Sequence, residues 1–278
     1  MLLQTQPIKL KLRLAMSFGL ILGGSNLALA NETIAPVVIS EAVFTETPAV
    51  VQPIEDAQTI YDRSVNIFSS DNIYFIVDSD IRYADGETEE RAFILAKESS
   101  GGDESSILIR FLAPANIKCT TVLVNKTADQ TNRFAYFPSL NRTRVIPEKD
   151  KQKEVFGIGI SYEDLNKPSG LFSPTEEVEK MGKKFYKLTL KEDNKSSIYL
   201  VSAEDYLLTE LTVFKDEQLE KRVKIHQVET FFGEKMITAW EVFDPKKDRT
   251  IQYKIRSESI QQEPKASLFF KNSLSRCR

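Results

Sequence analysis

The side chains best suited to nucleophilic or metal chemistry in this 278-residue sequence are its one histidine, His226, and its two cysteines, Cys119 and Cys277. A zinc centre needs three or four His, Cys or acidic ligands, and one histidine among charged and polar neighbours does not supply them. A Ser-His-Asp triad would need a serine on a sharp strand-to-helix turn, and no such context is present. We therefore expect no catalytic group, no metal and no cofactor.

One glycine segment, Gly157-Ile158-Gly159, superficially resembles a phosphate-binding loop. It lacks a third glycine and the strand-turn-helix setting that such a loop requires. The acidic runs at residues 87–90 and 176–179 are more typical of solvated faces than of paired catalytic carboxylates. These patterns favour a binding protein over an enzyme.

The amino terminus carries an export signal. Lys9, Lys11 and Arg13 precede an apolar core at residues 14–22, and an A-x-A site at residues 28–30 follows. The alternative, a membrane anchor, would need about 20 apolar residues, and polar residues interrupt this run too early. We predict a cleavable signal peptide at residues 1–30 and a mature protein outside the cytoplasm.

Composition restricts the partners of the mature chain. The formal net charge is −3, and removal of three basic residues with the signal takes it to −6 (−3 minus 3). A negative protein is a poor ligand for a polyanion, so we expect no nucleic acid partner. The mature chain has no second long apolar run, and we expect that it does not span a membrane.

The pairing of Cys119 and Cys277 stays open at this point. Export permits a disulfide. However, sequence does not show whether the two Cα atoms approach, and Cys277 is one residue from the end of the chain. We favour two unpaired thiols, with a disulfide as the alternative.

The mature chain divides into a tether and one large domain. Residues 31–53 contain three prolines without a helical or strand period, and we interpret them as a flexible linker. Residues 54–68 have apolar side chains at helical spacing, which predicts an amphipathic helix. Alternating patterns then predict strands at residues 73–78, 91–96, 107–112, 120–124, 133–137, 185–190, 197–201, 207–214, 223–230, 235–242 and 250–255.

Many antiparallel strands in one domain must curl or be covered, because a flat sheet exposes its edges and an apolar face. We therefore predict a mainly β fold with a few helices (α+β). In this fold a curved, incomplete antiparallel barrel has helices packed over its concave side, and this arrangement leaves a hydrophobic cavity.

The central segment carries a series of four motifs. They are R-F-L-A-P at residues 110–114, K-C-T at 118–120, F-A-Y-F-P-S-L-N-R-T-R-V-I at 134–146, and F-G at 156–157 running into S-Y-E-D at 161–164. This series closely resembles the outer membrane lipoprotein-sorting protein family, the LolA-like proteins often encoded beside RND-type (MMPL) exporters. That family shows R-F-x-x-P, K-G-T, W-x-Y-L-P-x-x-x-R-x-R-R-I and G-S-x-x-S/T-Y-E-D in the same order. The ending at residues 266–270 resembles the family's closing strand, so the resemblance covers residue 54 to the end.

Five positions depart from the family pattern. Cys119 replaces the turn glycine, Phe134 replaces the tryptophan, Val145 replaces a basic residue, and Ile158-Gly159 replaces Ser-Asp. The resemblance implies a LolA-like lipid- or lipoprotein-binding domain at residues 54–278, a half-barrel whose hydrophobic interior accepts acyl chains without a cofactor.

Within this frame some side chains are candidates for lining the cavity, with ordinary core packing as the equal alternative because the concave face of each strand is unknown. They are Phe111, Leu112, Phe134, Tyr136, Phe137, Leu140, Ile146, Phe156 and Tyr162. Arg142 and Arg144 project to one side of an extended segment and could contact a lipid headgroup or an acidic partner. We slightly favour a salt bridge to Glu163 or Asp164. Residues 156–172 could be a mobile lid.

The function that these observations predict is a periplasmic carrier in a Gram-negative-type cell. It binds lipid or lipoprotein acyl chains for sorting to the outer membrane, with an inner-membrane RND/MMPL exporter as the expected partner. The alternative is a non-transporting periplasmic sensor or adaptor that detects lipid or lipoprotein and signals by protein contact.

Overall fold

The computed structural model describes residues 54–65, 70–101 and 104–277. The predicted signal peptide and linker lie outside these residues. The described part contains one α-helix, α1 (Ala57–Arg63), and one antiparallel sheet of 15 strands. The prediction of a mainly antiparallel β fold is therefore confirmed.

The strands cover the predicted segments and add four short ones, β6, β7, β8 and β15. The first half holds β1 (Ile73–Tyr83), β2 (Thr88–Gly101), β3 (Glu104–Ala113), β4 (Thr121–Lys126), β5 (Thr131–Phe137), β6 (Arg142–Val145) and β7 (Leu171–Phe172). The second half holds β8 (Glu176–Lys180), β9 (Lys183–Glu192), β10 (Lys195–Ser202), β11 (Leu208–Lys215), β12 (Gln218–Phe231), β13 (Glu234–Asp244), β14 (Arg249–Ile255) and β15 (Gln261–Gln262).

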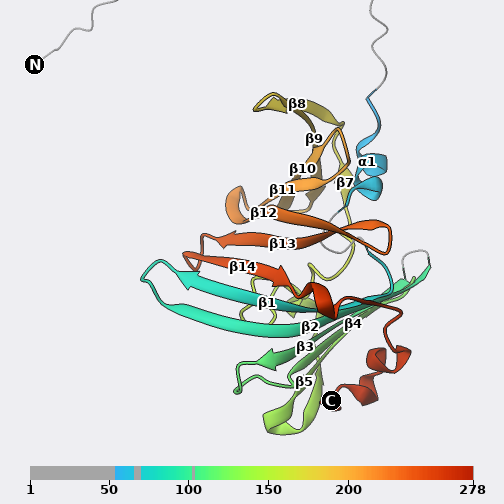
Figure 1. The fold of residues 1–278 in the computed structure, drawn as a ribbon, viewed down its shortest axis with the longest axis vertical. Coiled ribbons are helices and arrows are strands. Elements are labelled where there is room, and N and C mark those ends of the chain that lie inside the picture. The colour runs from blue at the N-terminus through green and yellow to red at the C-terminus, as the bar shows by residue number, and fades with distance from the viewer. Residues whose placement is uncertain (1–53, 66–69, 102–103, 278) are drawn as a thin grey trace, which may run out of the picture. The chain divides into compact units, whose positions relative to one another are not determined.

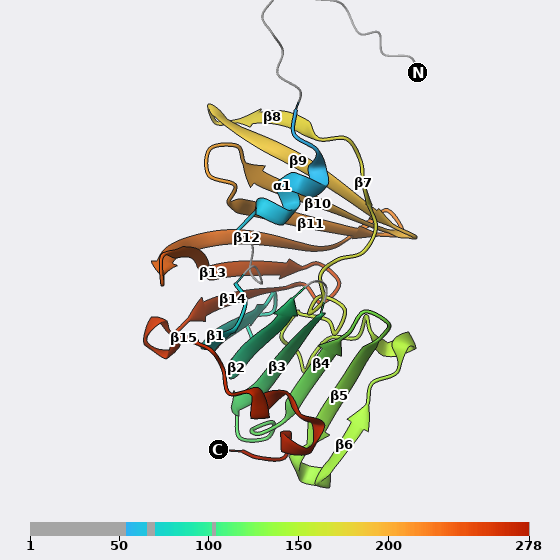
Figure 2. The same ribbon diagram turned by 90° about the vertical axis from the view of Figure 1, so that its right-hand side faces the viewer.

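The sheet is open. Its strand order is β6-β5-β4-β3-β2-β1-β14-β13-β12-β11-β10-β9-β7, with β15 on β1 and β8 on β9. The two ends of this order do not pair, so the barrel is incomplete, as predicted. Figures 1 and 2 show how β1 and β14 join the two halves at the centre of the curved sheet.

Strand register defines two faces of the sheet. Val77 lies opposite Phe93 and Ile255, and Phe93 lies opposite Phe111, so these side chains share one face. Val155 of the segment between β6 and β7 packs in the same cluster. We call this side the inner face and the opposite side the outer face. Because side chains alternate along a strand, the register fixes the face of every strand residue.

Helix α1 lies on the inner face over β9, β10 and β11 (Figure 2). The Asp56 carboxylate caps its amino end by accepting hydrogen bonds from the backbone N–H groups of Gln58 and Thr59 at 2.9 and 3.2 Å. Its buried residues, Ala57 and Ile60, pack against Leu188, Leu190, Tyr199, Val201 and Leu208.

The predicted helix at residues 54–68 is too long. Ser64 is extended (φ −70°, ψ 136°), and Val65 forms a parallel bridge with Leu207, so backbone pairing with the sheet replaces the helical hydrogen bonds. Residues 66–69 lie outside the described residues. The prediction of several covering helices is also wrong for the described residues, because apart from α1 they form only 3₁₀ turns. The irregular segment between β6 and β7 packs on the inner face instead.

The carboxyl-terminal segment covers the outer face of β2 to β5. The predicted closing strand at residues 266–270 is wrong, because Ala266–Phe269 and Lys271–Ser273 form 3₁₀ turns. Phe269 and Leu274 are buried against Ile94, Leu108, Leu123 and Tyr136. A compact turn presents both apolar side chains to the sheet without needing a strand edge.

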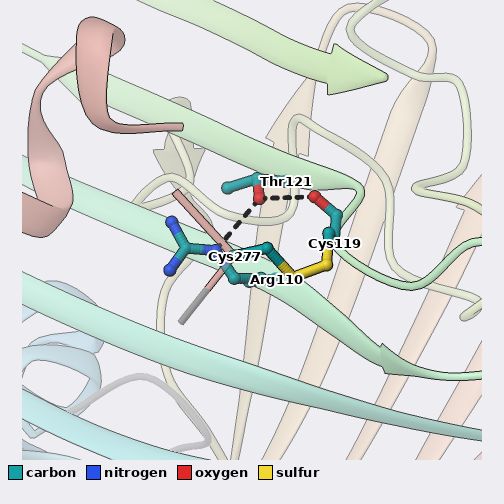
Figure 3. Close-up of a disulfide and its surroundings, with 4 residues drawn as sticks. All are labelled: Arg110, Cys119, Thr121 and Cys277. Carbon is teal, nitrogen blue, oxygen red and sulfur yellow. Dashed lines mark hydrogen bonds between the residues drawn. A yellow bond between two sulfur atoms is a disulfide. The ribbon is translucent and has the colours of Figure 1, made fainter. Parts of the chain in front are cut away.

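A disulfide joins this segment to the sheet, so our preference for two unpaired thiols is wrong. Cys119 and Cys277 are paired, with their Cα atoms 5.4 Å apart (Figure 3). Packing of the 3₁₀ turns on the outer face brings Cys277 to the β3–β4 turn despite its place near the chain end. Beside the bond, Arg110 Nε donates a hydrogen bond to Thr121 Oγ1 at 3.1 Å.

Candidate functional site

A cavity with a volume of about 600 Å³ lies on the inner face of the described residues. Its walls come from α1, from the segment between β6 and β7, and from strands in both halves of the sheet. The apolar part of the lining consists of Tyr61, Ile107, Ile160, Leu165, Tyr199, Leu208, Leu211, Val213, Val223, Trp240 and Val242.

Aromatic and branched side chains form the floor of this cavity. Tyr61 of α1 and Tyr199 of β10 contact edge to face, with ring centroids 5.1 Å apart. Trp240 is 2% exposed and stacks on Tyr253 at 4.8 Å. Burial raises the pKa of both Tyr61 and Tyr199 well above 10, so both stay neutral. The floor is therefore uncharged and suits an apolar ligand.

Charged side chains form the rim. Glu148 Oε2 accepts a hydrogen bond from Arg133 Nη1 at 2.6 Å, and Lys151 Nζ bridges Glu148 and Glu163 at 3.0 and 3.2 Å. Lys195 Nζ lies 3.4 Å from Glu163. This chain of alternating charges connects β5 with β10 through the segment between β6 and β7.

A second ion pair fixes the same segment from β12. Asp164 Oδ2 accepts from Lys221 Nζ at 2.5 Å. Burial alone would raise the pKa of Asp164, but the charges of Lys221 and Lys195 outweigh it, and the pKa lies below its ordinary value of 3.8. Asp164 is therefore ionised at neutral pH, which keeps the segment attached to the sheet.

The segment at residues 147–170 fills the centre of the inner face. Val155 and Ile158 are fully buried in the main core, and Leu165 is 2% exposed. We call residues 155–165 the plug. The buried residues of the plug belong to the core, and part of the plug also lines the cavity, namely Gly159, Ile160, Glu163, Asp164 and Leu165. A lid at residues 156–172 stays a prediction.

Glycine explains how the plug approaches the sheet so closely. Gly159 has φ +63°, and a Cβ at this position would lie 2.6 Å from Ile251 Cδ1. Its N–H donates to Glu154, whose carboxylate also pairs with the buried Arg249. Burial opposes ionisation of Glu154, but Lys247, the Gly159 N–H and Arg249 together lower its pKa. The G-I-G segment therefore serves packing.

The predicted cavity residues divide between the two faces. Phe111, Phe137 and Phe156 are on the inner face, where their rings meet at centroid distances of 5.6 Å. Ile146 and Tyr162 pack in the same core. Leu112, Phe134 and Tyr136 belong to the outer-face cluster under the carboxyl-terminal segment, and Leu140 is 54% exposed at a turn. The lining of the 600 Å³ cavity includes none of these nine, and their role in ligand binding stays a prediction.

The predicted salt bridge of Arg142 or Arg144 to Glu163 or Asp164 is wrong. Among the described residues those carboxylates pair with lysines, and both arginines are exposed on β6, the edge strand. Arg144 lies over the Phe137 ring at 5.6 Å. Lysines of the segment between β6 and β7, of β10 and of β12 occupy the carboxylates, and the exposed arginines are left to solvent.

Sequence reasoning missed the residues that line the cavity. Trp240 and Leu211 sit in ordinary alternating strands, and Arg133 was read only as the start of a strand. The alternation Thr131, Arg133, Ala135 places Arg133 with inward residues, and this signal could have flagged a basic side chain on an otherwise apolar face.

We searched the described residues for a metal-binding group and for a membrane-spanning helix. They contain no group of three or more His, Cys, Asp or Glu side chains placed to hold a metal ion. Likewise, no helix among them is long and apolar enough to cross a membrane. His226 is half exposed, 3.9 Å from Glu241.

Comparison with solved structures defines the class. A protein domain assigned to outer membrane lipoprotein sorting from Vibrio parahaemolyticus matches with a TM-score of 0.69 at 15% identity, covering 79% of this chain and 97% of that chain. A LolA superfamily protein from Nitrosomonas europaea matches with a TM-score of 0.63 at 13% identity, covering 79% and 99%. The fold is therefore LolA-like, and the resemblance in the motifs is confirmed.

A family model that matches most of the described sequence defines the family. The model of a family described as uncharacterized protein matches residues 103–276, and the chain belongs to this family. A DUF1329 family protein from Desulfovibrio piger has a similar structure, with a TM-score of 0.68 at 18% identity, covering 80% of this chain and all of that chain. No curated protein matches the chain.

Proposed function

We propose that this protein is a periplasmic carrier that holds lipid or lipoprotein acyl chains in the inner-face cavity during their transfer to the outer membrane. The observation that carries this proposal is the apolar floor of a 600 Å³ cavity in a LolA-like half-barrel. The signal predicted at residues 1–30 supports the location. The proposal assigns the protein no catalytic role.

The energetics of apolar burial suit such a ligand. Each buried CH₂ group contributes about 0.8 kcal/mol, so ten buried groups contribute roughly 8 kcal/mol. Before the cost of ordering the chain, this corresponds to a dissociation constant of about 1 μM. A carrier needs this intermediate affinity, because a much tighter complex would not release its cargo.

Release then requires a partner or a conformational change, because affinity alone does not favour one direction. In this proposal an inner-membrane exporter of the RND/MMPL type loads the carrier or accepts its cargo. The motif resemblance supports that pairing.

A sensor or adaptor is the second candidate. The exposure of Leu140 and Val145 (54% and 61%) beside Arg142 and Arg144 favours it, because exposed apolar and basic side chains at a sheet edge are suited to protein contact. Such a protein would bind lipid and a regulator without delivering cargo.

A pair of neighbouring variants tests the carrier. Leu211 lines the cavity, whereas Thr212 on the same strand points to the outer face. We expect protein from the native host to carry lipid detectable by mass spectrometry and to transfer it to acceptor vesicles. Leu211→Arg should lose this lipid and Thr212→Arg should keep it. Equal lipid content in both folded variants would refute the cavity assignment, and bound lipid that never transfers would favour the sensor.

A further inference from the structure

Polar side chains gather where β3, β4 and β5 reach one edge of the cavity. Ser105 lies directly opposite Lys126, and Lys126 lies opposite Thr131 in the antiparallel register. Arg133 is two residues from Thr131 on the same face. All four side chains line the cavity, and we call them the polar quartet.

The quartet is close enough to act on one ligand. Directly opposed residues have Cβ atoms about 5 Å apart, and diagonal neighbours about 7–8 Å apart, which long side chains span. Lys126 is therefore placed between two hydroxyl groups, with the Arg133 guanidinium diagonal to it. Two cationic donors and two hydroxyl donors thus lie side by side across three adjacent strands.

Unused hydrogen-bonding capacity marks the quartet as a binding site. The Arg133 side chain is 6% exposed, and its Nε is buried without a hydrogen-bond partner among the described residues. A buried donor left unpaired destabilises the protein, so a ligand that accepts a hydrogen bond from it removes that cost. In the described part of the chain no ion pair or side-chain hydrogen bond engages Lys126, Ser105 or Thr131 either.

The local charge balance favours an anion. Most other cations of the cavity have carboxylate partners, as Lys221 has Asp164 and Lys167 has Asp62. At the quartet, Arg133 and Lys151 share one carboxylate, that of Glu148. Lys126 has no carboxylate partner among the described residues. Glu104 also lines the cavity, but it is exposed and outside the quartet. The quartet therefore keeps an excess of positive charge.

We propose that the polar quartet binds the phosphate group of an anionic phospholipid or phosphorylated amphiphile whose chains lie on the apolar floor. Phosphate oxygens accept several hydrogen bonds, and guanidinium, ammonium and hydroxyl donors meet them in this arrangement. This inference rests on the proposed function and specifies the ligand: a headgroup at the β3–β5 edge and acyl chains between α1 and Trp240.

Three probes and two variants test the headgroup site on the mature chain. Binding is measured by native mass spectrometry and by Trp240 fluorescence with short-chain phosphatidylglycerol, with diacylglycerol of the same chains, and with inorganic phosphate. Lys126→Gln removes the charge that has no partner. Lys254→Gln is the matched control, because Lys254 is exposed on the outer face of β14.

We expect phosphatidylglycerol to bind at least about tenfold more tightly than diacylglycerol, and Lys126→Gln to remove this difference. The tenfold factor corresponds to about 1.4 kcal/mol, within the range of one charge-assisted hydrogen bond. Lys254→Gln should behave like the wild type. Inorganic phosphate should bind weakly and compete only at high concentration.

Other outcomes overturn the inference in distinct ways. Equal affinity for the two lipids, unchanged in Lys126→Gln, rejects the headgroup site and leaves the carrier proposal standing. Binding of phosphate without either lipid rejects the lipid headgroup as the source of the anion. Absence of binding by both lipids rejects the proposed function together with this inference.

Discussion

Replacing Cys119 separates two contributions to the stability of the β3–β4 turn. The disulfide closes a loop of 158 residues, for which the chain-entropy treatment gives about 5 kcal/mol of stabilisation. Measured disulfides more often contribute about 2–4 kcal/mol. The bond also holds Phe269 and Leu274 on the outer face. We therefore expect Cys277→Ser to lower the free energy of unfolding by about 2–4 kcal/mol.

The backbone at Cys119 opposes this stabilisation. Its φ is +68°, in the left-handed region, where a non-glycine residue costs roughly 1–2 kcal/mol. Glycine removes that cost but adds about 0.4–1 kcal/mol of unfolded-state entropy. Cys119→Gly should therefore be more stable than Cys119→Ser by roughly 0.5–1 kcal/mol, although both lose the disulfide.

Urea unfolding followed by the fluorescence of Trp240, the one tryptophan, measures these differences. A reductant should bring the wild type to the stability of Cys277→Ser and leave the variants unchanged. Equal stability of Cys119→Gly and Cys119→Ser would refute the turn argument. A Cys277→Ser variant as stable as the oxidised wild type would refute the stabilising role of the disulfide.

Three further predictions concern the plug and the edge hairpin. Because ionised Asp164 is stabilised in the folded state, its contribution is complete above pH 3.8 and is lost as the pH falls through its lower folded-state pKa. Asp164→Asn should therefore cost on the order of 3 kcal/mol at neutral pH and progressively less as the pH falls below 3.8, measured by urea unfolding, and a cost independent of pH would contradict this. Gly159→Ala, with its Cβ against Ile251, should cost roughly 2–3 kcal/mol and lower the melting temperature, whereas an unchanged melting temperature would show that the plug moves aside. Leu140→Glu should keep the lipid content of the wild type in the extraction assay, because Leu140 is exposed away from the cavity, and lipid loss in a folded variant would place it in the binding site.

The local sequence pattern was sufficient to predict the strands and the class of fold. Apolar and polar side chains alternate at residues 73–78 and 250–255 because one face of each strand is buried. A half-barrel buries one face of every strand in the same way. The turn at Cys119 was also visible, because a glycine in the related motif indicates a left-handed backbone position.

Long-range strand pairing determines the face on which each strand residue lies and the point at which α1 ends, and the sequence revealed neither. Phe134 and Phe137 look equivalent in the motif, yet they are three positions apart on β5 and lie on opposite faces. The face depends on the register with β4 and on the segment that covers each side, and neither is encoded locally. For the same reason, the end of α1 at Arg63 depends on the bridge between Val65 and Leu207.

The plug limits what the half-barrel of this protein can hold. Val155 and Ile158 occupy the centre of the inner face with fully buried side chains, so apolar ligand cannot enter there without unfolding part of the core. The remaining space lies between α1, β10 to β13 and the edge of β3 to β5, and charged side chains of the segment between β6 and β7 border it. Glu163 and Asp164, with their lysine partners, line this space together with Trp240. The same ion pairs that attach the plug to the sheet therefore also set the charge at the border of the cavity.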